Sequence, residues 1–411
     1  MQKNIYKKII TIVITILFLF TNTFIVFGSC DLKTEILYKK IDFDDEKIFD
    51  LKIKMLMFIG RIPSLSVGII ENDSIIHYKG YGHYNNHYLF FNRKEPNKDT
   101  IYNCGSISKS ISATALMILY EQEKFDLDDN VNDYLDFEVK NPYYPDDNIT
   151  FRMLLSHHSS LNSNQKNEII YLVLISIFNK EIYPYPLIKN LLESNKSILL
   201  NPIWADIKPG SEFLYSNIGF ILIEHLIEKI SEQSFNDFCK INIFDKLNMF
   251  NTSFTIKDLN KNQIAVPSGE IFGIYFRFPK INGAAAPGGL RSSVNDLSNY
   301  LILHMNNGTF EGKQILSEEN ITLMHTIQYP GTYPPDSDSK YGLGWQIWVN
   351  EGIMGHIGEV PGGFALMMMN KTYKKGIVLF TNRMLYNNNR NISQKFFNYI
   401  IDLIIERYSV F

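Results

Sequence analysis

The chain has 411 residues, of which 45% are hydrophobic and 20% charged, and its formal net charge is −3 at pH 7. This balance gives no excess of basic residues, so we expect no nucleic-acid partner. The length permits one large domain or two closely joined lobes. Three cysteines make no disulfide framework. Cys104 and Cys239 could pair, but they are better interpreted as small buried hydrophobic residues.

Residues 1–30 have the order of a secretory signal peptide. Three lysines precede a mostly apolar stretch, residues 9–27, and the small residues Gly28 and Ser29 follow it before Cys30. We therefore expect a secreted protein or one in the lumen of the secretory pathway. The alternative is an uncleaved signal anchor, with residues 9–27 as the only contact with a membrane, because this stretch approaches the roughly 20 residues that span a bilayer. Asn-x-Ser/Thr sequons favour a glycoprotein; they begin at Asn72, Asn148, Asn195, Asn251, Asn307, Asn320, Asn370 and Asn391.

Residues 31–411 are predicted to form one domain, which starts with an amphipathic segment at residues 45–59. The apolar run at residues 63–70 predicts a strand, and residues 75–81 predict its hairpin partner after a polar turn.

Ser106 follows this hairpin and precedes an almost wholly apolar segment. Lys109 is the only charged residue between Asn103 and Tyr120. If the segment is helical, Ser106 and Lys109 are neighbours on its surface, and the pair can act as nucleophile and activator. Gly105 permits a tight entry turn. The alternative is a core helix whose lysine snorkels to solvent.

A mostly helical lobe is predicted at about residues 125–300, with the most irregular stretch at residues 162–206. Tyr215 and Asn217 end a loop rich in Pro and Gly, directly before an amphipathic helix at residues 218–230. Asn217 has an alternative role as the N-cap of that helix, and Tyr215 as an ordinary buried aromatic residue.

Two pairs of histidines raise the question of a metal site. His157 and His158 are adjacent, and in an extended segment their side chains point apart. His83 and His87 have helical ligand spacing, but the surrounding residues are typical of a hairpin. No pattern of Cys, Asp or Glu ligands accompanies either pair, so we predict no metal.

The last third of the chain returns to strand-like runs at residues 345–349, 363–369 and 376–381, and an amphipathic helix follows at residues 396–405. His356-x-Gly358 lies between such runs, where a glycine permits close approach of a ligand and the histidine can present a donor or acceptor. The alternative interpretation of His356 is a structural histidine near a turn. Strands at both ends and helices between them predict an α+β fold: an antiparallel sheet flanked by N- and C-terminal helices, with an inserted helical lobe.

Together, Ser106-x-x-Lys109, Tyr215-x-Asn217 and His356-x-Gly358 resemble the three motifs of the serine beta-lactamase superfamily. The branch is the one with class C beta-lactamases, penicillin-binding-protein-like proteins, D-aminopeptidases and related esterases. The resemblance covers roughly residues 63–385. It includes similar sequence between the motifs, at residues 154–161, 209–211, 288–293 and 341–345.

The resemblance implies a role for each motif residue. Ser106 would accept the acyl group, Lys109 would activate it, and Tyr215 would share the acid and base work. Asn217 would hydrogen-bond substrate. The oxyanion hole would come from the backbone N–H groups of Ser106 and Glu359, the residue after Gly358.

One departure from the antibiotic-degrading members bears on the substrate. They have the lysine of K-T-G where this chain has His356, and a histidine with a pKa near 6.5 is largely neutral at pH 7. We therefore expect a cofactor-free serine hydrolase for small esters or amides rather than mainly for antibiotics. The alternatives are an acyltransferase and a non-catalytic binding or assembly protein with the same fold. A second departure is His158-Ser-Ser160, where members of the family commonly have Thr-Ser-Gly. We expect this change to reshape a loop without altering the chemistry.

Overall fold

A computed structural model describes residues 46–85, 93–162, 189, 192, 203–271, 274–278, 285–333, 339–384 and 392–411. The chain divides into two compact units, Met1–Ile53 and Lys54–Phe411. The predicted signal segment at residues 1–30, its apolar stretch at 9–27 and most of the irregular stretch at 162–206 lie outside the described residues. None of the helices described is long and apolar enough to cross a membrane.

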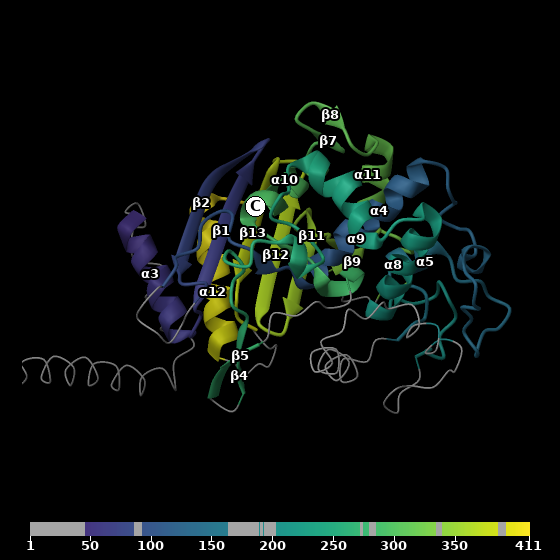
Figure 1. Cartoon of the computed structure of the whole chain (residues 1–411), viewed down its shortest axis with the longest axis horizontal. Helices are drawn as coiled ribbons and strands as arrows, with labels where there is room; N and C mark the ends of the chain where they lie inside the picture. The colour runs from purple at the N-terminus through teal and green to yellow at the C-terminus, as the bar shows by residue number, and fades with distance from the viewer. Residues whose placement is uncertain are drawn as a thin grey trace, which may run out of the picture. The chain divides into compact units, whose positions relative to one another are not determined.

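A seven-stranded antiparallel sheet forms from both ends of the second unit, in the order β2-β1-β13-β12-β11-β10-β9 (Figure 1). β1 pairs with β2 on one side and with β13 on the other, so that Val67 lies opposite Lys79 and Leu379. The predicted sharing of one sheet by the two ends is confirmed. The strands are β1 (Ser64–Glu71), β2 (Ser74–Gly82), β9 (Ser339–Tyr341), β10 (Gln346–Trp348), β11 (Ile353–Val360), β12 (Gly363–Asn370) and β13 (Lys375–Thr381).

Within the described residues, three short strand pairs lie outside this sheet. They are β3 (Tyr102–Asn103) with β6 (Arg291–Ser292), β4 (Ser268–Ile271) with β5 (Ile274–Arg277), and β7 (Thr309–Phe310) with β8 (Lys313–Gln314). The pairing of Tyr102 with Ser292 ties the segment before Ser106 to the end of the helical lobe.

Eight α-helices lie within the described residues, and Figure 1 shows α4, α5, α8 and α9 gathered to one side of the sheet. They are α3 (Glu46–Ile59), α4 (Ser108–Glu121), α5 (Phe151–Leu155), α8 (Asn217–Ser231), α9 (Phe235–Cys239), α10 (Val294–Met305), α11 (Glu318–Met324) and α12 (Ile392–Tyr408). Shorter helical turns are η1 (Gly105–Ile107), η2 (Val131–Tyr134), η3 (Lys240–Phe244), η4 (Asp245–Leu247), η5 (Ile256–Asp258) and η6 (Ala285–Gly289).

The sheet is covered by helices from different parts of the chain. α10 starts within the range expected for the helical lobe, yet it packs on the sheet. Two sheet glycines show how closely, since a Cβ added at Gly68 would lie 2.5 Å from Val294 and one added at Gly376 would lie 2.7 Å from Leu301. The C-terminal helix α12 also covers sheet residues, with the ring of Phe397 4.9 Å from that of Phe364 in an edge-on contact.

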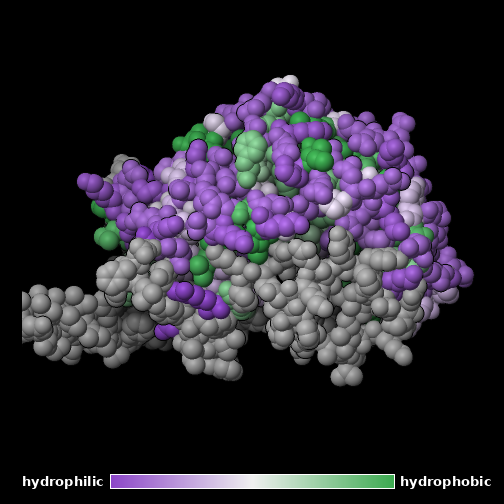
Figure 2. All heavy atoms as spheres, viewed as in Figure 1, coloured by the Kyte–Doolittle hydropathy of each residue, from purple (hydrophilic) through white to green (hydrophobic). Residues whose placement is uncertain are grey.

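The interior is mostly apolar and includes two of the three cysteines. Cys104 and Cys239 are buried free thiols, as expected. The described residues on the face seen in Figure 2 are mostly hydrophilic, with hydrophobic residues in small scattered groups. Asn320 and Asn370 are buried at 7% and 4% exposure, so these two sequons are poorly placed to accept a glycan.

Candidate active site

Ser106 lies in the helical turn η1, which leads directly into α4. Gly105 enters this turn with φ of +53°, a conformation that favours glycine. Lys109 is in the first turn of α4, and its Nζ lies 3.2 Å from Ser106 Oγ. The contact expected from the spacing of the two residues is therefore present, and Ser106 itself remains partly exposed.

Lys109 is fully buried, so the interpretation that it snorkels to solvent is wrong. α4 is buried from Ser108 to Leu119, which leaves the lysine no path to the surface. Its Nζ donates a hydrogen bond to the carbonyl oxygen of Pro287 at 2.7 Å, and it lies 4.9 Å from the centre of the Tyr215 ring. The amine is thus held between the nucleophile and the tyrosine of the second motif.

The carbonyl that accepts from Lys109 belongs to η6, which is fixed from two helices. Glu224 on α8 accepts the backbone N–H of Ala286 at 2.9 Å, and Ser112 on α4 donates to the Ala286 carbonyl at 3.2 Å. Burial raises the pKa of Glu224 to about 8, so its carboxyl is mostly protonated at pH 7. Sequence reasoning missed Glu224, although an acidic residue inside the apolar run 220–227 was a signal that could have found it.

Tyr215 and Asn217 stand at the start of α8, as predicted, but the helix cap is a different residue. Ser216 is the N-cap, and its Oγ accepts the backbone N–H of Gly219 at 3.1 Å. Asn217 is the first residue of the helix, so its interpretation as the N-cap is wrong. Tyr215 is half-buried, and its ring lies 6.4 Å from that of Tyr341.

His356 is inside strand β11, not near a turn, and is 3% exposed. Its Nδ1 bonds the Ile357 carbonyl at 2.7 Å, and its Nε2 bonds the Tyr341 hydroxyl. A carbonyl only accepts, so Nδ1 carries the proton, and in the neutral ring Nε2 accepts from Tyr341. Burial, and then the nearby Lys109, lower the pKa of His356 to about 3. The expectation of a histidine with a pKa near 6.5 and an available ring nitrogen is therefore wrong.

Glycine at position 358 lets β11 touch the turn that carries Ser106. A Cβ at Gly358 would lie 1.8 Å from the Cys104 carbonyl oxygen and 3.0 Å from the Ser106 nitrogen. A Cβ at Gly105 would lie 2.7 Å from the nitrogen of Glu359. Both positions exclude a side chain, and the backbone nitrogens of Ser106 and Glu359 flank the same contact.

The two adjacent histidines are not in an extended segment as predicted, since His157 has φ of +64° directly after α5. They still bond different partners, because His157 Nδ1 accepts the backbone N–H of Ser216 and His158 Nε2 bonds Thr332 Oγ1. Ser160 also adopts a positive φ, +58°, at the position where the resemblance stated above implies the glycine of Thr-Ser-Gly. Over the part of the chain that the structure describes, which excludes His87, no three His, Cys, Asp or Glu residues are grouped to hold a metal.

Comparisons with known proteins show the family and the fold of the chain. The family model described as Beta-lactamase matches residues 49–394. Protein flp of Staphylococcus aureus (strain MRSA252) is 24% identical over 343 residues, which cover 82% of this chain and 63% of that protein. The chain thus spans less than two thirds of the length of this relative.

Two solved structures are similar over most of the chain. The octameric penicillin-binding protein homologue from Pyrococcus abyssi has a TM-score of 0.71 and 26% identity, covering 87% of this chain and 78% of that one. The D-amino acid amidase from Ochrobactrum anthropi SV3 has a TM-score of 0.66 and 16% identity, covering 88% and 99%. The second likeness concerns the fold alone.

Proposed function

The chain belongs to the beta-lactamase family, and from this we propose that it is a serine hydrolase that forms an acyl-enzyme on Ser106. The observation that carries the proposal is the buried amine of Lys109, 3.2 Å from Ser106 Oγ. An amine withdrawn from water at hydrogen-bond distance from a serine is suited to activate that serine as a nucleophile.

In the proposed reaction, Ser106 Oγ attacks the carbonyl carbon of the substrate and passes its proton to Lys109 and Tyr215. These two act as a coupled unit that starts with one proton fewer than an ammonium and a phenol together, so that it can accept the proton of Ser106. The same unit returns a proton to the leaving alcohol or amine as the bond to it breaks. A water molecule then attacks the acyl carbon and releases the acid and Ser106. The contact of Lys109 Nζ with the Pro287 carbonyl keeps the amine in place throughout.

The oxyanion would be stabilised by the backbone N–H groups of Ser106 and Glu359. The contact between Gly105 and Gly358 supports this assignment, because it brings both nitrogens to one place with no side chain between them. Donors fixed in this way need no rearrangement when negative charge develops on the substrate oxygen. Asn217, at the first position of α8, would hydrogen-bond the substrate.

We propose small neutral esters or amides as substrates, rather than beta-lactams held by their carboxylate. The argument is that His356 is uncharged and has both ring nitrogens bonded, so the third motif supplies no fixed cation. His356 would then contribute to substrate binding only through Tyr341. The name of the D-amino acid amidase makes amides the first compounds to try.

Fluorophosphonate labelling followed by turnover of a chromogenic ester and a D-amino acid amide tests the proposal. We expect stoichiometric labelling of the wild type at Ser106 and none in Ser106→Ala. Lys109→Met should label at least about 100-fold more slowly, as loss of a positioned acid or base predicts. Ser211→Ala, at an exposed serine that bonds only the nearby Lys208 carbonyl among the contacts described, is the matched control. Equal turnover by the wild type and Ser106→Ala would overturn the proposal, and product formed only with added alcohol or amine would assign an acyltransferase.

A further inference from the structure

His157 accepts hydrogen bonds from the residues on both sides of Tyr215. Its backbone carbonyl accepts the N–H of Leu214 at 2.8 Å, and its ring Nδ1 accepts the N–H of Ser216 at 3.0 Å. Its ring also lies against that of Tyr215, with 4.3 Å between centroids. One residue therefore contacts the Tyr215 ring and the peptides on both sides of it.

These contacts also determine the state of the imidazole. A backbone N–H only donates, so Nδ1 carries no proton, and in the neutral ring the proton is on Nε2. The residue is fully buried, and Nε2 has no hydrogen-bond partner among the residues that the structure describes. Burial, followed by the charge of Lys109, lowers the pKa of His157 well below its usual value, in agreement with a neutral ring.

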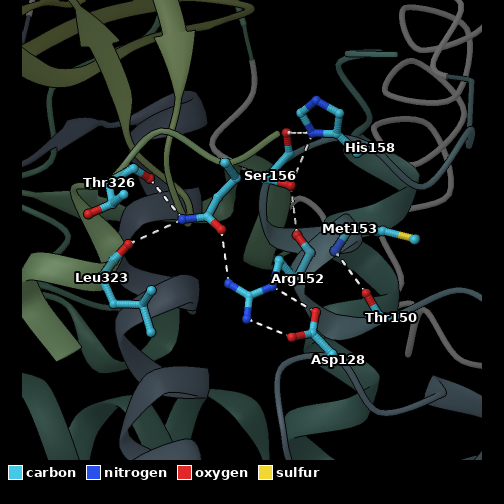
Figure 3. Close-up of polar contacts among 9 residues, drawn as sticks. Asp128, Thr150, Arg152, Met153, Ser156, His158, Leu323 and Thr326 are labelled. Carbon is cyan, nitrogen blue, oxygen red and sulfur yellow. Dashed lines mark hydrogen bonds and ion pairs between the residues drawn. The ribbon is translucent and has the colours of Figure 1, made fainter. Parts of the chain in front are cut away.

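The turn that carries His157 is held from outside the site. Arg152 on α5 forms a two-pronged ion pair with Asp128, at 2.7 and 2.8 Å (Figure 3). Ser156 Oγ donates to the Arg152 carbonyl at 2.7 Å, and His158 Nδ1 bonds the Ser156 carbonyl at 2.8 Å. His158 Nε2 bonds Thr332 beyond the turn. A left-handed φ is uncommon for a residue with a side chain, and these contacts surround the turn in which His157 adopts it.

We propose that His157 is the positioning residue for Tyr215, holding the tyrosine in reach of Lys109 and Ser106 by bonding both flanking peptides. This inference rests on the proposed function, in which Tyr215 transfers protons. The position of such a group matters greatly, since a misplacement of about 1 Å can cost on the order of 100-fold in rate. The role is indirect, because His157 acts on the reaction through Tyr215.

A pair of nearly isosteric variants separates the hydrogen bond from the shape of the side chain. His157→Asn places an oxygen where Nδ1 stands, and asparagine tolerates a left-handed φ. His157→Leu has a similar shape without the acceptor. Glu232→Leu measures the strain of leucine at a left-handed position, φ +57°, on the exposed end of α8.

We expect His157→Leu to lower kcat and the rate of Ser106 acylation by about 10- to 100-fold with little change in KM. His157→Asn should stay within about fivefold of the wild type, and Glu232→Leu should lose only thermal stability. Equal rates for the Leu and Asn variants would overturn the positioning role, as would losses in activity that simply follow the melting temperature.

Two measurements without substrate separate this inference from the proposed function. The ¹⁵N spectrum of the wild type should show His157 protonated at Nε2 only, and hydrogen exchange at Ser216 N–H should be slow and accelerate in His157→Leu. Fast exchange at Ser216 in the wild type would overturn the positioning role of His157 and leave the proposed function untouched. Wild-type protein that never acylates at Ser106 would instead overturn the proposed function, and the catalytic role of His157 with it.

Discussion

The hydroxyl of Tyr341 donates to Nε2 of His356, which makes the third motif a neutral, buried pair instead of a charged group. Burial sets this state, since the pKa of His356 falls to about 3. Tyr341 comes from the end of β9 and His356 from β11, on either side of β10 in the sheet order.

This pair predicts that His356 does not titrate in the physiological range. A histidine whose pKa is near 3 is neutral throughout pH 5 to 8, so its ¹⁵N signals should stay constant over that range, and kcat/KM should show no ionisation from it. Tyr341→Phe leaves Nε2 buried without a donor, and we expect a loss of about 1–3 kcal/mol in unfolding free energy. An imidazole signal of His356 that shifts near pH 6.5 would contradict the prediction.

The contact between β11 and η1 predicts that Gly358→Ala abolishes acylation. The new Cβ would fall 1.8 Å from the Cys104 carbonyl oxygen, so the strand must move away from Ser106. We expect a loss of several kcal/mol in urea unfolding, in the range of severe overpacking, and no labelling by fluorophosphonate. Gly331→Ala is the control, since no described residue lies within 4 Å of its Cβ and its φ is not positive. Normal labelling of Gly358→Ala would show that the two backbones need not touch.

Much of this site could be predicted because its chemistry depends on local spacing. Ser106 and Lys109 are three residues apart on one helical segment, and the apolar run after them indicated burial. The sheet was predictable for a similar reason, since the terminal strands are long apolar runs next to turns.

What could not be predicted depends on residues that are distant in the sequence. The third motif was placed between strand-like runs, with a structural histidine near a turn as the alternative for His356, whereas both His356 and Gly358 lie within β11. The pKa of His356 depends on burial by the fold and then on the nearby Lys109. The N-cap role considered as the alternative for Asn217 belongs to Ser216, one residue earlier, which is equally suited by residue type.

The start of α8 predicts separable effects for two neighbouring residues. Ser216→Ala removes the cap that accepts from Gly219, and we expect it to cost about 1 kcal/mol of unfolding free energy. Asn217→Ala leaves that cap in place, and if Asn217 bonds substrate, kcat/KM should fall by about tenfold. Ser317→Ala, which removes the cap of α11, controls for the loss of a cap elsewhere. The assignment would be contradicted if Asn217→Ala kept full activity and lost stability like Ser216→Ala.

The buried carboxyl of Glu224 predicts a pH dependence of stability. Its pKa is about 8 in the fold against a usual value of 4.5, so between these values the unfolded chain ionises and the folded protein does not. Fewer protons are then bound in the unfolded state, and stability falls as the pH rises from about 4.5 to about 8. Glu224→Gln keeps a side-chain oxygen that can accept the Ala286 N–H, and its amide does not ionise.

We therefore expect wild type and Glu224→Gln to differ in the slope of unfolding free energy against pH. Between pH 5 and 8, the unfolding free energy of the variant should rise relative to that of the wild type. The difference should reach up to about 5 kcal/mol if the whole pKa shift of Glu224 contributes to stability. Urea unfolding at several pH values measures this. Glu228→Gln, one turn further along α8 at a half-buried carboxyl whose pKa burial also raises, should show a smaller difference. Parallel curves for wild type and Glu224→Gln would mean that Glu224 is ionised in the fold, which would place a negative charge beside the peptide that holds Lys109.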